Sequence, residues 1–317
     1  MCQYMLDKLE LEVVTHKLPF RLNHVNCFVA EGEDGHLVID AGLHRDETVE
    51  LWDEVLADKD VSDILVTHYH PDHIGYAGGL QAKHKARVSM SKVDADNARS
   101  AWSEDYLSKL LDKYNECGIP ASISQEMLDN TREFLPRISP LPNIDHYFEE
   151  HEKIKIGKYE YEVIFTPGHS DGLVNFYNED EKVLISTDHI LPRITPNISY
   201  WFYGDDNPLK TYLQSLNKVK ALNADYVIPS HGKPFYDANK RIDEIIQHHD
   251  DRLNETIEKI PGNHTIHTIC NAMFDFELTI HETRFAIGET IAHLEYLRIK
   301  EEIERYEVDG IWHYDVK

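Results

Sequence analysis

Five short apolar segments of this chain each lead into a histidine or an aspartate. Their length and their content of β-branched, leucine and aromatic residues are typical of β-strands. They are residues 36–39 before Asp40, 63–67 before His68, 161–165 before His169, 182–186 before Asp188, and 225–229 before His231. Because a rigid sheet fixes the loops at its strand ends, we expect these side chains to form one site on a β-sheet framework.

The loop at residues 66–79, VTHYHPDHIGYAGG, carries the densest group of these side chains. His68 and His70 alternate, as two ligands on the same side of an extended segment do, and Asp72 and His73 follow a proline that turns the chain. With 20 histidines in the chain, a polar loop would explain a single H-x-H pattern. The full H-x-H-x-D-H pattern instead predicts a metal site, because Zn²⁺ prefers imidazole nitrogen and carboxylate oxygen.

The complete series of these residues resembles the dinuclear ligand set of the metallo-β-lactamase superfamily. The series is His68-x-His70-x-Asp72-His73, then His169, Asp188 and His231. Residues 166–170 (TPGHS) and 38–42 (VIDAG) are similar to the flanking signatures of that family, and the resemblance covers about residues 10–235. Residues 188–197 and 234–235, with His248 and His249, are similar to a bacterial branch of hydrolases related to the animal β-lactamase-like protein 2.

The resemblance implies two divalent metal ions per chain, with zinc expected first and manganese or iron as alternatives. It assigns His68, His70 and His169 to one ion and Asp72, His73 and His231 to the other, with Asp188 bridging both. Asp40 matches an aspartate that orients metal-binding groups by hydrogen bonds. The chain departs from the family at Thr187, where a glycine usually precedes the bridging aspartate.

The reaction that the resemblance implies is hydrolysis. Two divalent ions about 3.5–4 Å apart share a hydroxide, lower its proton affinity and polarise a substrate oxygen. Asp72 would both bind the second ion and hold the attacking hydroxide. We therefore expect a dinuclear metal-dependent hydrolase of a carboxylic ester, thioester or lactone. A metal-dependent ribonuclease or phosphodiesterase and a mononuclear iron persulfide dioxygenase, both known in the same superfamily, are the alternatives.

The fold that the resemblance implies is of the α+β class, the αβ/βα metallo-β-lactamase sandwich. The catalytic domain is expected at residues 1–237, and a polar, helix-favouring insertion interrupts it at about residues 94–136. A small C-terminal domain is expected at residues 238–317.

The C-terminal domain is predicted to be helical and winged-helix-like. An apolar stripe from Ile242 to Ile260 predicts its first helix, and residues 264–274 and 284–299 predict two more. A hairpin should follow, because Asp309-Gly310 fits a two-residue turn between two short strands.

The charge of the chain bears on its partners. It carries 32 Lys and Arg against 57 Asp and Glu, a formal charge of −25, which repels polyanions over the distances at which steering acts. A winged helix could make the protein a DNA-binding regulator, but the candidate recognition helix at residues 286–298 carries Glu289 and Glu295 against Arg298. We therefore expect a small-molecule substrate and no nucleic-acid partner.

Two aromatic groups are candidates for the substrate pocket. Trp102 and Tyr106 lie in the inserted segment, at helical spacing with further apolar residues. The second group is the consecutive run Tyr200, Trp201, Phe202 and Tyr203, whose rings cannot all face one core. An amphipathic helix packed on the core is the alternative for the first group, and a subunit contact, as in a homodimer, is the alternative for the second.

The cellular compartment is predicted from three absences in the sequence. The first residues have no basic region followed by an apolar core, and so do not match a secretory signal. No apolar run approaches the roughly 20 residues that span a membrane. Cys2, Cys27, Cys117 and Cys270 are scattered without C-x-x-C spacing, which is typical of reduced cysteines. We expect a cytoplasmic protein without a membrane partner.

Overall fold

The computed structural model describes residues 2–274 and 277–317. These residues form two compact units, each made of segments that are separate in the sequence. Unit 1 contains residues up to 98, 134–196 and 215–242, and unit 2 contains residues 99–133, 197–214 and 243–317. Most of the inserted segment and most of the C-terminal segment thus belong to the same unit. The predicted domain boundary after residue 237 stays a prediction.

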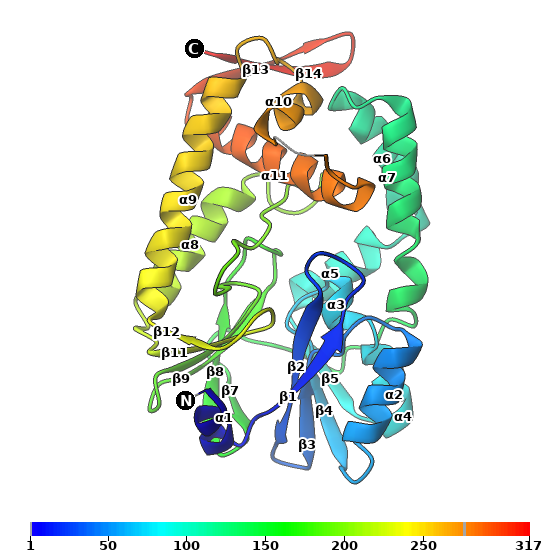
Figure 1. Ribbon diagram of the computed structural model, residues 1–317. Coiled ribbons are helices and arrows are strands. Elements are labelled where there is room, and N and C mark those ends of the chain that lie inside the picture. The colour runs from blue at the N-terminus through cyan, green and yellow to red at the C-terminus, as the bar shows by residue number, and fades with distance from the viewer. Residues whose placement is uncertain (1, 275–276) are drawn as a thin grey trace. The chain divides into compact units, whose positions relative to one another are not determined.

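Unit 1 contains two six-stranded sheets, and the first holds the earlier strands (Figure 1). Its order is β1 (Glu12–Lys17), β2 (His24–Glu31), β3 (His36–Ile39), β4 (Val61–Leu65), β5 (Arg87–Met90) and β6 (His146–Tyr147). The pairs β1–β2 and β2–β3 are antiparallel, whereas β3, β4, β5 and β6 run parallel to one another. The carboxyl ends of β3, β4 and β5 therefore lie side by side at one edge of this sheet.

The second sheet of unit 1 holds the later strands. Its order is β12 (Phe235–Tyr236), β11 (Tyr226–Pro229), β10 (Val183–Thr187), β9 (Val174–Asn178), β8 (Tyr159–Phe165) and β7 (Lys153–Ile156). The pair β10–β11 is parallel, and the other neighbours are antiparallel. Because β9 is antiparallel to both of its neighbours, β8, β10 and β11 all run in the same direction.

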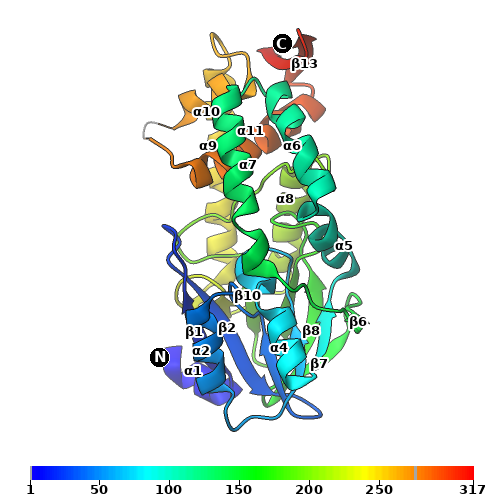
Figure 2. The same cartoon turned by 90° about the vertical axis from the view of Figure 1, so that its right-hand side faces the viewer.

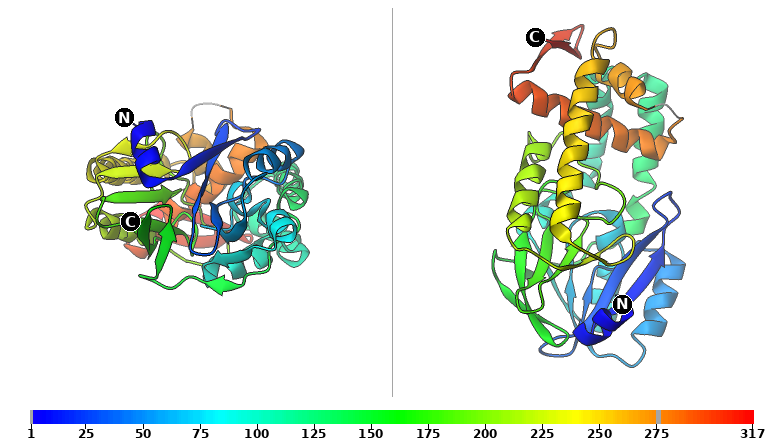
Figure 3. Two further views of the ribbon diagram at one scale, coloured as in Figure 1. Left: turned by 90° about the horizontal axis from the view of Figure 1, so that it is seen from below. Right: turned by 60° about the vertical axis from the view of Figure 1, so that its left-hand side comes forward.

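The apolar core of unit 1 lies between the two sheets. Phe28 and Ile39 of the first sheet and Phe176 and Ile185 of the second belong to one buried cluster. Every residue of β10 is buried, as expected for a strand covered on both faces. Helices α2 (Asp46–Val55) and α4 (Ala77–His84) pack on the first sheet and lie on its outer side (Figure 2; Figure 3, left). The predicted sandwich, with sheets inside and helices outside, is confirmed.

Unit 2 packs inserted helices against C-terminal ones. Helix α6 (Glu104–Glu116) lies against α7 (Ala121–Arg132), and α7 contacts α11 (Ile280–Ile299). Helix α11 also contacts α10 (Ile266–Met273) and β13 (Ile303–Val308), which pairs with β14 (Ile311–Val316). The inserted segment is therefore helical, as predicted. Three further helices have residues in both units: α5 (Lys92–Ala101), α8 (Pro208–Lys220) and α9 (Ala238–Lys259).

Local sequence signals account for the ends of these C-terminal elements. Asp309 (φ 51°) and Gly310 (φ 80°) have the positive φ of a primed two-residue turn, and the predicted hairpin is confirmed. Helix α11 begins at Ile280 rather than at residue 284, because Thr279 and Glu282 form a capping box.

In the inserted segment, Trp102 lies in the turn between α5 and α6 rather than on a helix.

Two observations bear on the predicted compartment. Among the described residues, none of the helices combines the length and the apolar character that a membrane crossing requires. Cys27, Cys117 and Cys270 are free and buried. Burial raises the pKa of Cys270 to about 11, so this thiol stays protonated at neutral pH.

His16 on β1 is a buried histidine outside the predicted site. Its ring lies 5.0 Å from that of Trp52 on α2, and its exposed fraction is 2%. Its Nε2 atom makes no hydrogen bond with any residue that the structure describes. Burial lowers the pKa of His16 to about 4, whereas an unfolded chain has a histidine pKa of about 6.5. The folded protein therefore keeps this imidazole neutral in mild acid.

We predict that His16 makes the protein less stable in mild acid. Between about pH 6.5 and pH 4 the unfolded chain binds a proton at this position that the folded chain does not, so the free energy of unfolding falls as pH falls. In His16→Leu, the slope of the unfolding free energy against pH near pH 5 should be smaller by up to about 1.4 kcal/mol per pH unit. Urea unfolding of both proteins in chelator measures this slope. Equal slopes would mean that His16 is already protonated in the folded state.

Candidate metal centre

The predicted site residues lie at the carboxyl ends of strands in unit 1. The loop after β4 carries His68 and His70, and its Pro71 is the first residue of the short helix α3 (Pro71–Ile74), a position that favours proline. That helical turn places Asp72 and His73 directly after the two alternating histidines. The other predicted ligands follow the second sheet: His169 comes after β8, Asp188 after β10, and His231 after β11.

All seven predicted ligands meet in three overlapping groups. In each group the candidate ligand atoms lie within 4.8 Å of one another. The groups are His68, His70 and His169; His68, His73 and Asp188; and Asp72, His73 and His231. The first and third are the two sets that the resemblance assigned to separate ions, and are called below the three-histidine group and the Asp72 group. Their binding of metal stays a prediction.

Asp188 lies between these two groups. Its Oδ2 atom is 3.5 Å from His169 Nε2, 3.5 Å from His73 Nε2 and 3.2 Å from His231 Nε2. The carboxylate therefore reaches one histidine of the three-histidine group and two of the Asp72 group. This is the geometry that a bridging ligand requires.

Several ligand atoms of the Asp72 group and Asp188 are buried without a well-formed hydrogen bond. His73 Nε2, His231 Nε2 and Asp188 Oδ1 make no hydrogen bond of good geometry with the described residues, although the two ring nitrogens lie 3.5 Å and 3.2 Å from Asp188 Oδ2. The opposite ring nitrogens are held, His73 Nδ1 by Asp40 Oδ2 at 2.8 Å and His231 Nδ1 by the carbonyl of His24 at 2.6 Å. Each ring thus keeps one nitrogen for the cluster, and the donor set fits a divalent cation such as zinc.

The three-histidine group fits a cation for a related reason. His70 Nδ1 lies 3.1 Å from His68 Nε2 and 2.9 Å from His169 Nε2. Three ring nitrogens that meet in this way can share only one proton per contact, whereas a cation can accept all three lone pairs. On the far side of the His68 ring, Nδ1 lies 3.0 Å from Thr67 Oγ1.

The carboxylates and imidazoles of the cluster shift the pKa values of one another. Burial lowers the pKa of His73, but the carboxylates, Asp188 first, outweigh burial and raise it well above the usual value. Burial raises the pKa of Asp188, but His231 and His73 outweigh it and lower this pKa well below the usual range. The imidazoles and carboxylates of the cluster thus favour the charged forms of one another, the protonated ring and the ionised carboxylate. Metal binding would release these protons, so that it competes with acid.

Asp40 lies at the end of β3, in the left-handed region at φ 60°. Its carboxylate accepts hydrogen bonds from Thr67 N at 2.9 Å and Thr67 Oγ1 at 2.8 Å, and contacts His73 Nδ1. It therefore ties the ends of β3 and β4 together and fixes one ligand ring. These contacts are those that the predicted orienting role needs, and the role itself stays a prediction.

Thr187 occupies the position before Asp188 in a conformation that favours glycine. Its φ is 45°, which is uncommon for any residue with a Cβ atom and rarer still for a β-branched one. The side chain is buried, and its Oγ1 donates to Asn175 Oδ1 at 2.9 Å. The departure from the family noted in the sequence is therefore a strained threonine, whose Oγ1 also lies 3.4 Å from the carbonyl oxygen of Val174.

Asp94 is a buried residue of the site that the sequence reasoning missed. It is fully buried near the start of α5, and its carboxylate accepts hydrogen bonds from Tyr69 N, Ser170 Oγ and Gly172 N. Burial raises its pKa to about 7, although the bonds from Ser170 and Gly172 act to lower it. The signal that could have found it is its place after β5, whose carboxyl end lies beside that of β4.

The predicted pocket aromatics come together within unit 2. The hydroxyl of Tyr106 donates to the carbonyl of Trp201 at 2.6 Å, and its ring lies 5.0 Å from that of Tyr203. The rings of Tyr200 and Phe202 are 5.6 Å apart, and all four residues of the run are half-buried. Trp102 is also half-buried. Their role as a substrate pocket stays a prediction.

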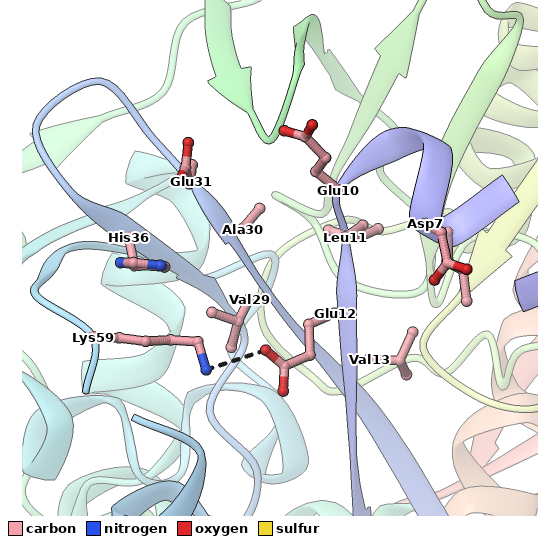
Figure 4. Close-up of a pocket in the computed structure, with 11 residues that line it drawn as sticks. Asp7, Glu10, Leu11, Glu12, Val13, Val29, Ala30, Glu31, His36 and Lys59 are labelled. Atoms are coloured by element: carbon pink, nitrogen blue, oxygen red, sulfur yellow. Dashed lines mark ion pairs between the residues drawn. The ribbon is translucent and has the colours of Figure 1, made fainter. Parts of the chain in front are cut away.

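A surface pocket of about 410 Å³ lies beside α1 (Cys2–Leu9), and Figure 4 shows the residues that line it. Glu10, Glu12 and Glu31 line it, and Glu12 pairs with Lys59 at 3.2 Å. None of the seven predicted ligands belongs to its lining. Its acidic residues are exposed, and it is not part of the candidate metal centre.

Two models of known protein families match this chain. Residues 21–231, which include all seven predicted ligands, match the metallo-beta-lactamase superfamily. Residues 253–317 match a second model, described as the metallo-beta-lactamase-like, C-terminal domain. The chain belongs to the metallo-β-lactamase superfamily.

Known relatives match the C-terminal region as well as the sandwich. The chain is 23% identical over 316 residues to the probable metallo-hydrolase YqjP of Bacillus subtilis, with 95% of each chain covered. It is 24% identical over 251 residues to the beta-lactamase-like protein 2 homolog of Caenorhabditis elegans, covering 78% of this chain and 69% of that protein. A solved metallo-beta-lactamase family protein from Thermus thermophilus is 29% identical, with a TM-score of 0.85, and the match covers 97% of this chain and 99% of that one.

We predict that glycine is more stable than alanine at position 187. Both Thr187→Gly and Thr187→Ala lose the hydroxyl that bonds to Asn175, but only glycine relieves the positive φ. The glycine variant should therefore unfold with a free energy about 1 kcal/mol higher than the alanine variant. Denaturant unfolding in chelator, which removes any contribution of metal, measures the difference. The reverse order, as at ordinary positions, would contradict the strain.

Proposed function

We propose that this protein is a dinuclear metal-dependent hydrolase that cleaves a carboxylic ester, thioester or lactone in a small molecule. The observation that carries the proposal is that the three-histidine group and the Asp72 group meet at Asp188, with three buried ligand atoms that make no hydrogen bond of good geometry with the described residues. The similarity to YqjP, which is named a probable metallo-hydrolase, supports the hydrolytic class.

In this proposal the ligands divide between two ions. The three-histidine group would hold one, the Asp72 group would hold the other, and Asp188 would be a ligand of both. Zinc is the proposed metal because all seven ligands are imidazole or carboxylate groups, and manganese and iron are the alternatives. Two such ions supply an acidified water as nucleophile and a Lewis acid for the substrate oxygen.

Asp72 has the position of a catalytic carboxylate. Its side chain is 19% exposed, whereas those of Asp188 and His231 are 8% and 2% exposed. It is therefore the carboxylate of the cluster most open to water and substrate. We propose that it accepts a hydrogen bond from the attacking water, orients it and takes its proton. The buried histidines around it keep bulk water away from the developing charge, which strengthens the electrostatic interactions of the site.

The charges of the chain favour a small substrate over a nucleic acid. The formal charge of −25 opposes the approach of a polyanion. In unit 2, most side chains of α11 from Ala286 to Leu297 are buried, and Glu295 pairs with Arg298 and Arg305. A recognition helix needs instead an exposed face that enters a groove. We therefore propose that the C-terminal region is winged-helix-like only in the order of its elements and does not read DNA.

The proposal extends to the compartment and the assembly of the protein. The buried free thiols of Cys27, Cys117 and Cys270 support a reducing compartment, the cytoplasm, and no membrane partner is proposed. The aromatic run at residues 200–203 is proposed as part of the substrate pocket. A contact in a homodimer is the other role that its half-buried rings allow.

A substrate panel tests the proposed function. Zinc-loaded enzyme is assayed on lactones, aryl esters, acyl-CoA and glutathione thioesters, and RNA. We expect hydrolysis of at least one carbonyl class and no cleavage of RNA. Cleavage of RNA without any carbonyl hydrolysis would identify a ribonuclease instead. One iron per chain together with persulfide oxidation would identify a dioxygenase.

We predict that substitutions in the cluster and in the aromatic groups affect kinetics differently. Asp72→Ala should lower kcat/KM for every ester alike, on the order of 10³-fold, because it removes a group used in every transition state. Trp201→Ala and Trp102→Ala should instead change the ranking of esters of increasing chain length, roughly tenfold per lost contact. Kinetics on three such esters measure both effects.

A matched control for the tryptophan variants is Trp312→Ala. Trp312 lies on β14 under Arg305, whose guanidinium carbon is 4.2 Å from its ring centre, and it belongs to neither aromatic group. This variant should keep the wild-type ratios across the ester series. Wild-type ratios in both Trp201→Ala and Trp102→Ala would show that the aromatic groups are structural and do not form the pocket.

A further inference from the structure

The Asp94 carboxylate is a contact shared by the two loops that carry the three-histidine group. Oδ2 accepts from Tyr69 N at 3.2 Å and from Ser170 Oγ at 2.6 Å, and Oδ1 accepts from Gly172 N at 2.7 Å. Tyr69 lies between His68 and His70 in the sequence. Ser170 directly follows His169. All three ligands of the group are therefore next in sequence to a residue that Asp94 holds.

The packing around Asp94 leaves room for this contact and for little else. A Cβ atom on Gly172 would lie 2.8 Å from Asp94 Oδ1 and 2.3 Å from Ser91 Oγ, so only glycine lets this backbone come so close. The backbone N–H of Asp94 in turn donates to Ser91 Oγ at 3.2 Å. Ser91 is buried as well, and the carboxylate is thus fixed by the start of α5.

The Asp72 group has a different set of supports. His73 Nδ1 contacts Asp40, and His231 Nδ1 donates to the carbonyl of His24. Neither of these supports touches Asp94 in any hydrogen bond described above. Asp94 thus contacts residues next to all three ligands of the three-histidine group, whereas Asp40 contacts His73 of the Asp72 group directly and reaches His68 through Thr67.

We infer that Asp94 is a positioning residue that sets the metal affinity of the three-histidine group and not that of the Asp72 group. The inference rests on the proposed dinuclear metal function. All three partners of Asp94 are donors, so a carboxylate, which only accepts, satisfies them together. An asparagine of the same size would point its NH₂ group at either Gly172 N–H or Tyr69 N–H. The loops would then move apart, and a ligand cluster depends on such outer contacts for its geometry.

Zinc binding to Asp94→Asn tests the inference. Competition with a chelator, followed by metal analysis, gives the affinity of each of two zinc ions per chain. In Asp94→Asn one zinc should bind about 10–100-fold more weakly and the other with wild-type affinity. The matched control is Asp96→Asn, two residues further along α5, where an exposed carboxylate pairs with Lys92. This control should bind both ions like the wild type.

A second experiment needs neither metal nor activity. Hydrogen exchange of the metal-free protein should become faster in residues 66–73 and 166–173 of Asp94→Asn, because the amides of Tyr69 and Gly172 lose their acceptor. Ser170→Ala removes only the side-chain donor. Its hydrogen exchange should become faster in the same two segments, but by a smaller factor. Ser170→Ala serves as the test variant if Asp94→Asn does not fold.

The identity of the weakened site is checked in a His169→Ala background, which lacks a ligand of the three-histidine group. There Asp94→Asn should leave the affinity of the remaining zinc unchanged. Wild-type affinities for both ions in Asp94→Asn, or equal weakening of both, would overturn the inference while leaving the dinuclear function intact. A wild-type protein that binds no metal would instead overturn the proposed function, and the inference with it.

Discussion

The structure of the site depends on burying the carboxylate of Asp188 among histidine rings. Its Oδ2 atom lies within 3.5 Å of ring nitrogens from three histidines, which reach it from the loop after β4 and from the ends of β8 and β11. A buried charge is tolerated only where other charges or hydrogen bonds balance it. Both sheets must therefore hold their strand ends in register around this one group. The apolar core between the sheets supplies the rigidity that this requires.

The site is built from local conformations that are unfavourable on their own. Asp40 and Thr187 both have positive φ, and three ligand atoms are buried without a hydrogen bond of good geometry to any described residue. Each positive φ costs on the order of 1–3 kcal/mol. Such costs persist at functional sites, where the surrounding fold holds them in place and a bound ligand offsets part of them. The burial of β10 on both faces is one way in which the fold holds Thr187 and Asp188 in place.

Most of the sandwich and all members of the cluster could be predicted from the sequence because their signals are local. Residues 36–39 were predicted as a strand and form β3, and Asp309-Gly310 closes the hairpin as its turn chemistry requires. The ligands were identifiable because each follows a short apolar run. The family resemblance then assigned them to two groups, which are also two groups in space.

The parts that could not be predicted depend on contacts between distant segments. Asp94 is one aspartate in a polar helical stretch, and only the neighbouring ends of β4 and β5 bring it to the ligand loops. The packing of α7 on α11 joins segments that lie far apart in the chain, which no periodicity reveals. The start of α11 differs from the predicted residue 284 for another reason, because the capping box of Thr279 and Glu282 lies before the apolar pattern on which the prediction rested.

Anomalous diffraction from crystals grown with zinc tests the central claim most directly. The account predicts two zinc peaks about 3.5–4 Å apart, one among His68, His70 and His169 and the other among Asp72, His73 and His231. In crystals of Asp188→Ala at least one of the two peaks should weaken or vanish, since the shared carboxylate is gone. A single peak in the wild type, or two peaks of full occupancy in Asp188→Ala, would contradict a dinuclear centre bridged by this residue.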